Sequence, residues 1–131
     1  MTGLDTNVLV RYIMQDDPKQ SPKANRLIES LSVEAPGFVS VISLIELVWV
    51  ISSCFDLTRQ QVAAAIESLL RTKEFVVDRA DVVAQALRRF KAGSADFADC
   101  LIERIAASAG CARTMTFDLA AAKSAGMTLV G

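Results

Sequence analysis

Short apolar segments of the chain alternate with longer segments in which apolar residues recur every three or four positions. The short segments are typical of buried strands, and the longer ones are typical of helices with one apolar face. Because helices fall between nearly all of the predicted strands, this order favours a parallel sheet that is covered on both faces. The predicted strands are residues 1–4, 38–39, 75–77, 112–116 and 127–130.

Local sequence signals indicate where the helices begin and end. Ser21, followed by a proline, predicts a capped helix start, and Thr58 with Gln61 predicts a capping box. Gly110 is a residue type that commonly follows the end of a helix. The segment 41–54 is apolar nearly all round, which predicts a buried helix. Helices are predicted over residues 8–13, 21–31, 41–54, 58–70, 78–90, 95–109 and 118–124.

The composition restricts the possible functions. At 131 residues, of which 52% are apolar, the chain is long enough to bury a core, and we expect a single domain over residues 1–131. A formal net charge of −1 gives no electrostatic case for nucleic-acid binding by the protein as a whole, so such binding needs local basic clusters or a bound metal. The absence of histidine excludes His general bases, Ser-His-Asp triads and most zinc sites.

The cysteines and the longest apolar run bear on location. Cys54, Cys100 and Cys111 are odd in number and form no C-x-x-C pair, so we expect small buried side chains in a reducing compartment. Residues 38–55 are near the lower length limit for a membrane span. However, Glu46 would cost about 2.5–3.5 kcal/mol at the centre of a bilayer, and four serines interrupt the run. We therefore expect a cytoplasmic protein without a membrane segment.

Two acids follow predicted strands. Asp5 stands at the carboxyl end of the first strand, where ligands bind in open α/β sheets, with Thr6 and Asn7 as small polar neighbours. Asp118 follows a later strand in the same way, two residues after Thr116. If these strands are neighbours, the two carboxylates converge at one sheet edge. The alternative interpretation is that each acid only caps the helix after it.

Three further acids lie in predicted helices. Glu46 lies within the apolar segment 41–54, with no Lys or Arg within a helical turn, so a buried carboxylate there needs a metal or a hydrogen-bond partner. Ser43, three residues earlier, shares its helix face. Asp96 and Asp99 are also three residues apart, near a helix start that favours negative charge. Helix capping by Asp96 and an ordinary first-turn acid at Asp99 are the alternatives.

A cluster of carboxylates without histidine suits a particular kind of chemistry. Ligands that are all oxygen favour Mg²⁺ or Mn²⁺ over the transition metals that prefer nitrogen and sulfur. Such ions activate water and stabilise the charge that develops on a phosphoryl group. Hydrolysis of a phosphodiester is therefore the reaction that these residues fit best.

Four segments of the chain occur in the order and spacing of one known family. The segments are LDTNVL at residues 4–9, SVISLIEL at 40–47, ADFADCLI at 95–102 and TFD at 116–118. Each is weak alone, but together they span nearly the whole chain. With them the sequence resembles the PIN-domain ribonucleases, specifically the VapC type of toxin from bacterial and archaeal toxin–antitoxin pairs.

The resemblance implies an α/β, PIN-like domain, with a central parallel β-sheet of four to five short strands flanked by helices on both faces. It implies Mg²⁺- or Mn²⁺-dependent endonucleolytic cleavage of RNA, a homodimer, and inhibition by a cognate antitoxin protein. The acidic quartet of the family falls on Asp5, Glu46, Asp99 and Asp118, which become the expected metal ligands, with Asp96 as an additional acid of the catalytic site. The expected supporting residues are Thr6, Asn7, Ser43 and Thr116.

Two other functions are alternatives. An aspartyl-phosphate phosphatase or phosphotransferase would use Asp5 as its nucleophile, but such enzymes usually have a second aspartate two residues later, where this chain has Asn7. A catalytically idle binding module could share the PIN fold, although the complete acidic quartet argues against it. Trapping of a phospho-aspartate would favour the first alternative, and absence of RNA cleavage with Mn²⁺ would favour the second.

Overall fold

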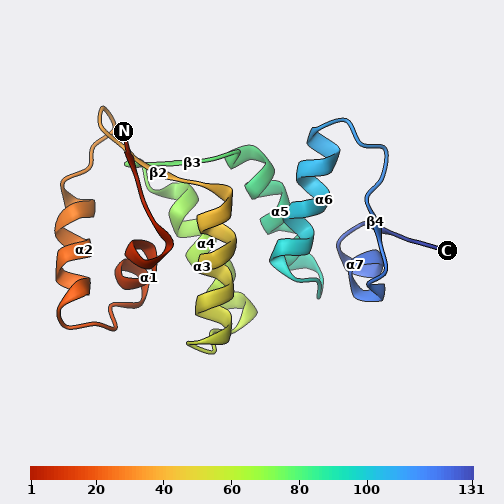
Figure 1. The fold of residues 1–131 in the computed structure, drawn as a ribbon, viewed down its shortest axis with the longest axis horizontal. Helices are drawn as coiled ribbons and strands as arrows, with labels where there is room; N and C mark the ends of the chain where they lie inside the picture. Colours follow the sequence, from red (N-terminus) through yellow and green to blue (C-terminus); the bar gives the residue numbers. More distant parts are fainter. The chain divides into compact units, whose positions relative to one another are not determined.

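The computed structural model describes residues 1–131 as two compact units, Met1–Asp78 and Arg79–Gly131. Seven α-helices and five short strands alternate along the chain (Figure 1). All strand pairs are parallel, three strands in one sheet and two in another.

The first unit contains a three-stranded sheet in the order β1-β2-β3, and two helices precede each of β2 and β3. Parallel neighbours need such crossover connections, because a tight turn can only join antiparallel strands. The strands are β1 (Thr2–Gly3), β2 (Gly37–Val39) and β3 (Phe75–Val77). The helices are α1 (Thr6–Met14), α2 (Gln20–Glu29), α3 (Val41–Ser53) and α4 (Arg59–Arg71).

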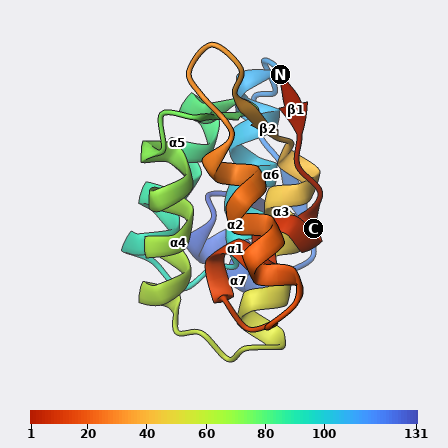
Figure 2. The same ribbon diagram turned by 90° about the vertical axis from the view of Figure 1, so that its left-hand side faces the viewer.

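Helix α1 packs against both α2 and α3, and α4 packs against β3 (Figure 2). Leu9, Leu44 and Ile66 are fully buried members of this core, from α1, α3 and α4. Gly37 lets the sheet approach its neighbours closely, because a Cβ there would lie 2.8 Å from side-chain carbons of Leu4 and Leu31. Gly37 lies opposite Thr2 in the register of the first two strands.

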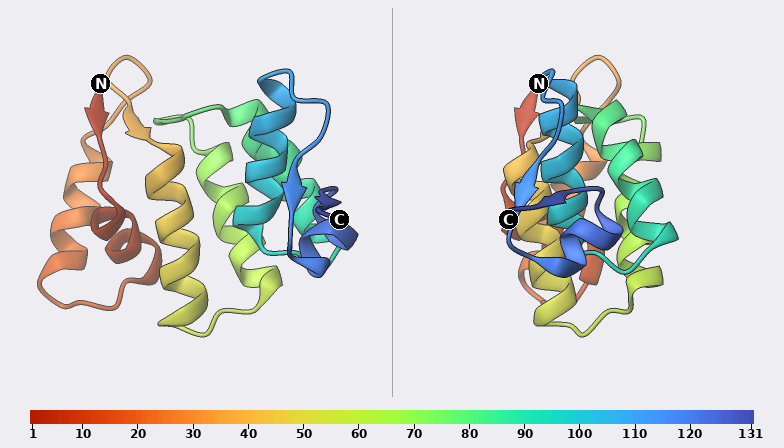
Figure 3. Two further views of the ribbon diagram at one scale, coloured as in Figure 1. Left: turned by 45° about the vertical axis from the view of Figure 1, so that its right-hand side comes forward. Right: turned by 90° about the vertical axis from the view of Figure 1, so that its right-hand side faces the viewer.

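The second unit contains two packed helices followed by a small parallel strand pair (Figure 3). Phe90 and Phe97 meet edge to face in the packed pair, with ring centroids 5.8 Å apart. The short α7 connects the two strands and contacts both of them. The elements are α5 (Ala80–Ala92), α6 (Phe97–Ser108), β4 (Met115–Thr116), α7 (Leu119–Ser124) and β5 (Thr128–Leu129).

The predicted α/β class, the parallel pairing and the five strands are confirmed. The sequence predicts one central sheet, whereas the structure has a three-stranded and a two-stranded sheet. The last two strands are shorter than predicted, because only two residues of each join their ladder. None of the helices combines the length and the apolar character needed to cross a membrane.

Most predicted helix ends are confirmed. Thr58 and Gln61 form the expected reciprocal capping box at the start of α4. Gly110 has a φ of +94° just after α6, a left-handed conformation that favours glycine. The cap predicted at Ser21 is wrong, since Asp17 accepts hydrogen bonds from the first free N–H groups of α2 and the Ser21 hydroxyl donates to the Arg11 carbonyl.

Two predictions of burial are also corrected. Helix α3 is not buried all round, because Ile42 and Trp49 are 70% and 65% exposed. Of the cysteines, Cys100 is buried, but Cys54 and Cys111 are exposed. All three are free thiols. Apolar residue type therefore overestimates burial in this chain, as expected where apolar atoms make up much of a protein surface.

Candidate functional site

In the first unit, Thr6 connects two of the predicted acids. Asp5 is the N-cap residue of α1, and its Oδ1 accepts a hydrogen bond of 2.7 Å from the Thr6 backbone N–H. The buried Thr6 hydroxyl donates a hydrogen bond of 3.0 Å to Oε2 of Glu46 on α3. One residue at the start of α1 therefore holds both carboxylates, which are 41 positions apart in the sequence.

Glu46 is exposed, so the predicted burial of its carboxylate is wrong. Helix α3 buries the face that carries Leu44, Leu47 and Ile51, whereas Glu46 lies on the opposite stripe with Ile42. The apolar residues of α3 are simply more numerous than its buried face needs. The hydrogen bond from Thr6 gives Glu46 a partner without any burial of charge.

The predicted supporting residues of this unit have different surroundings. Ser43 accepts a hydrogen bond from the Ser40 hydroxyl, and its backbone N–H donates to that same hydroxyl at the start of α3. These bonds make Ser43 part of the helix cap. Asn7 is exposed and borders a hollow.

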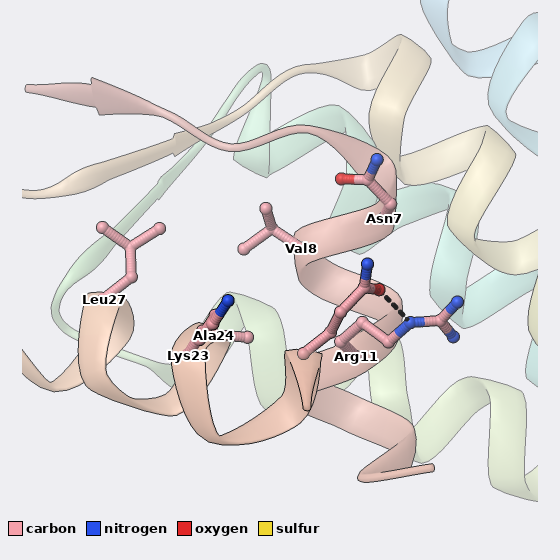
Figure 4. A pocket seen from close by; sticks show the side chains of 7 residues that line it. Asn7, Val8, Arg11, Lys23, Ala24 and Leu27 are labelled. Carbon is pink, nitrogen blue, oxygen red and sulfur yellow. Dashed lines mark hydrogen bonds between the residues drawn. The ribbon is translucent and has the colours of Figure 1, made fainter. Parts of the chain in front are cut away.

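That hollow lies between α1 and α2 and has a volume of about 260 Å³ (Figure 4). Its apolar lining consists of Val8 from α1 with Ala24 and Leu27 from α2. The polar groups at its border are Asn7, Arg11, Gln20 and Lys23, and the Arg11 Nε donates to the Gln20 side chain at 2.8 Å. The acids that Thr6 contacts and this partly apolar hollow therefore both lie next to the start of α1.

In the second unit, three acids lie close enough to influence one another. Burial raises the pKa of Asp99, and the negative charges of Asp96 and Asp118 raise that pKa further. Asp96 is the N-cap residue of α6, but its side chain makes no capping hydrogen bond, so the alternative interpretation as a side-chain cap is wrong. Asp99 is half-buried in the first turn of the same helix, and Asp96 and Asp118 are exposed.

Asp118 is held by two local interactions. Its Oδ1 accepts hydrogen bonds from the N–H groups of Ala120 and Ala121, at 2.8 and 3.3 Å, which confirms its role as the cap of α7. Its own N–H donates to the Thr116 hydroxyl at 3.0 Å, so Thr116 does support Asp118. The strands before Asp5 and Asp118 are not paired, because β1 pairs with β2 and β4 with β5.

The chemistry of these acids fits a hard divalent cation in donor type, since every candidate ligand is a carboxylate oxygen. Within neither unit are three or more acidic or cysteine side chains arranged so that they could hold a metal ion. The first unit contributes Asp5 and Glu46, and the second contributes Asp96, Asp99 and Asp118. Burial, followed by the charges of Asp96 and Asp118, raises the pKa of Asp99, and a bound cation would favour the ionised form.

Sequence reasoning missed an ion-pair cluster behind the acids of the second unit. Glu103, on α6 one turn after Asp99, is 8% exposed. Its carboxylate accepts from Nε and Nη2 of Arg104, at 2.7 and 2.9 Å, and from Nη1 of Arg89 on α5 at 2.9 Å. The hydrogen bonds from Arg104 hold the pKa of Glu103 below its usual range. The sequence feature that could have indicated this cluster is Glu103, which stands three positions after Cys100 and therefore shares its helix face.

Arg89 also reaches the end of α7. Its Nη1 donates to the carbonyl oxygen of Ala125 at 2.8 Å, so one guanidinium bridges α6 and the residue after α7. Gly126 makes room for this contact, because a Cβ there would overlap the same nitrogen. The helix that begins at Asp118 is thereby tied to the helix that carries Asp99.

No curated protein shows significant similarity to the chain. The family model of the PIN domain, in contrast, matches residues 4–127, a range that includes all five candidate acids. PIN domains form a nuclease superfamily whose members generally use divalent metals, and carboxylate oxygens are ligands that such metals accept. The chain therefore belongs to the PIN-domain family of nucleases.

Proposed function

We propose that the chain is a Mg²⁺- or Mn²⁺-dependent endoribonuclease that acts as the toxin of a toxin–antitoxin pair. The observation that carries this proposal is the family match over residues 4–127, a range that contains Asp5, Glu46, Asp99 and Asp118. Membership supports nuclease chemistry in general. The narrower assignment to RNA, and to a toxin that works in the cytoplasm, rests on the resemblance of the four motif segments to VapC-type toxins.

In this proposal Asp5, Glu46, Asp99 and Asp118 are the metal ligands. A bound divalent ion would activate water and offset negative charge on the phosphodiester. Thr6 orients the carboxylates of Asp5 and Glu46 through its two hydrogen bonds. In the second unit, Asp118 is oriented by two contacts: its N–H donates to the Thr116 hydroxyl, and its carboxylate accepts from the N–H groups at the start of α7.

Asp96 is assigned a supporting role. It lies at the cap position of α6, three residues before Asp99, and its charge raises the pKa of that residue. It makes no capping hydrogen bond, so its carboxylate is available to a water molecule or a second cation. Groups that orient a metal ligand typically contribute about 10–100-fold to affinity or activity.

A cognate antitoxin and a second copy of the chain are the proposed partners. The hollow between α1 and α2 supports docking of an amphipathic antitoxin segment, since its apolar lining is bordered by Arg11 and Lys23. Exposed Ile42, Trp49 and Phe117 support a homodimer, because a small monomer rarely exposes so much apolar surface. Light scattering that shows a monomer at micromolar concentration would contradict the dimer.

The decisive experiment is a cleavage assay on total cellular RNA with purified protein, followed by sequencing of the new ends. We expect discrete cuts with Mn²⁺ or Mg²⁺ and none with EDTA. Asp5→Asn is the matched inactive control, because it keeps the shape of the side chain. Full activity in EDTA would refute metal dependence, and no cleavage under any metal would favour the idle binding module.

A further inference from the structure

A second hollow, of about 480 Å³, lies on the second unit, and none of the predicted site residues lines it. Its lining consists of Gln85, Arg88 and Arg89 from α5 and Arg104 from α6. All four side chains end in N–H donors, and neither an acidic nor an apolar side chain lines the hollow. Such a lining favours an anion that has little apolar surface of its own.

Two of these arginines, Arg89 and Arg104, are fixed by hydrogen bonds within the unit. The buried Glu103 binds the guanidinium groups of Arg89 and Arg104, and Ala125 accepts a further hydrogen bond from Arg89. Arg104 Nη1 also lies 3.5 Å from the Gln85 oxygen. The hydrogen bonds of Arg89 use Nη1 alone, so its Nε and Nη2 groups still have N–H donors for a ligand.

The third arginine is unpaired. Arg88 is exposed and makes no hydrogen bond or ion pair in the structure. Its helix neighbours at three and four positions are Ala84, Gln85, Lys91 and Ala92, so no acid lies within reach along α5. Its whole guanidinium fork is available, and this geometry suits bidentate contact with phosphate oxygens.

The charges of the cluster point to the same kind of ligand. Three guanidinium groups against the single carboxylate of Glu103 leave a local charge of +2, on a chain whose net charge is −1. The cluster is therefore a local basic site of the kind that nucleic-acid binding requires in a chain with this composition. The lack of an apolar wall favours a phosphate backbone over an acidic peptide, which would bring apolar side chains.

We propose that Arg88, Arg89 and Arg104 form a phosphate-binding site that holds the backbone of single-stranded RNA. The identity of the nucleic acid rests on the proposed ribonuclease function. Contacts to phosphate carry no sequence information, so this site contributes affinity and orientation rather than choice of the cleaved sequence.

The test is binding of a fluorescein-labelled single-stranded RNA, measured by anisotropy in EDTA over a range of salt concentrations. Arg88→Gln is the variant, because an exposed side chain can be changed without disturbing the fold. We expect weaker binding and a slope of log K against log salt that is shallower by about 0.7 for each lost phosphate contact. Arg71→Gln on α4 is the matched control, as it removes the same charge from a different helix.

Three results would overturn the site: no RNA binding by the wild type, equal binding by wild type and Arg88→Gln, or equal losses in Arg88→Gln and Arg71→Gln. Poly-glutamate is the competitor that tests a protein ligand, and displacement of RNA by it at equal charge concentration would also overturn the assignment. RNA cleavage is scored separately. A protein that cuts RNA but binds it equally after Arg88→Gln keeps the proposed function and loses this site.

Discussion

The acids of the two units are held in different ways. In the first unit, Asp5 and Glu46 are exposed and depend on one small residue, Thr6, for their hydrogen bonds. In the second unit, Asp99 is half-buried beside two other negative charges, and its pKa is raised by burial and by those charges. One pair of acids is solvated, whereas the other group contains a carboxylate whose ionised form is disfavoured.

The two units also differ in the partners of a carboxylate near the predicted acids. Glu103, Arg89 and Arg104 form an ion-pair cluster one turn beyond Asp99, and Arg89 extends it to Ala125. The first unit has no comparable cluster beneath Glu46, whose partner is a neutral hydroxyl. Glu46 thus has a neutral partner, whereas Glu103 has two charged ones.

Replacing Asp99, which lies beside two other acids, is expected to have the largest effect on RNA cleavage. Asp99→Asn should reduce RNA cleavage by more than about 100-fold, because loss of a direct ligand exceeds the 10–100-fold typical of groups that orient a ligand. It should also raise the Tm at neutral pH, since the raised pKa shows that ionised Asp99 is unfavourable in the folded state. Cleavage rates and calorimetry measure the two effects.

Asp96→Asn is the matched variant for that experiment. We expect an activity loss within about 10–100-fold and partial rescue by raised Mn²⁺. If Asp96→Asn is inactive and Asp99→Asn is the variant rescued by Mn²⁺, the assignment of the two acids is reversed.

The ion-pair cluster gives a pH-dependent prediction. The pKa of Glu103 is lowered in the folded state, mainly by Arg104, so its stabilising effect is full above the unfolded value near 4.5 and is lost as pH falls through the folded value. Glu103→Gln should cost about 1.5–3 kcal/mol at neutral pH, as hydrogen bonds to charged groups are lost. Its unfolding free energy should also fall less steeply than that of the wild type below pH 4.5.

Urea unfolding from pH 3 to 7 measures this difference. Glu67→Gln is the control, because Glu67 pairs with Arg71 on the surface of α4, where such pairs contribute about 0.3–0.5 kcal/mol. Parallel pH profiles of Glu103→Gln and wild type would show that the cluster does not stabilise the unit.

Local rules explain which parts of the fold could be predicted from the sequence. The capping box of Thr58 and Gln61, the cap at Asp118 and the helix end before Gly110 depend on residues within three positions, so their patterns are readable directly. Ser21 shows the limit of this approach. Asp17 accepts hydrogen bonds from the N–H groups at the start of α2, and the sequence alone does not show which of the two side chains is the acceptor.

Burial and long-range pairing could not be predicted in the same way. The apolar sequence of α3 does not show that one stripe of the helix, with Glu46, stays exposed. The contact between Arg89 and Glu103 joins residues 14 positions apart on two helices, and no local pattern encodes it. The roles assigned to the five acids likewise come from the family resemblance, since the acids lie in segments far apart in the sequence.

Two glycines with positive φ test how much the hydrogen bonds of Arg89 stabilise the second unit. Gly126→Ala places a methyl group against Nη1 of Arg89 and imposes a φ of +79° on alanine, whereas Gly110→Ala imposes a φ of +94° with nothing within 4 Å. Backbone strain of about 1–2 kcal/mol is common to both. We expect Gly126→Ala to cost about 1 kcal/mol more than Gly110→Ala, because its methyl group also displaces Arg89 from its hydrogen bonds. Equal losses in urea unfolding would show that the Arg89 contact contributes little.

The smallest effect on stability is expected at the hydrogen bond from Thr6 to Glu46. Glu46→Gln keeps an acceptor for the Thr6 hydroxyl, and the side chain is exposed, so the unfolding free energy should change by no more than about 0.5 kcal/mol although cleavage is lost. Thr6→Val removes the hydroxyl at nearly constant volume and should cost about 0.5–1.5 kcal/mol, the usual net value of one hydrogen bond. A loss above about 2 kcal/mol in Glu46→Gln would mean that Glu46 is a structural partner and that the two units hold their acids in the same way.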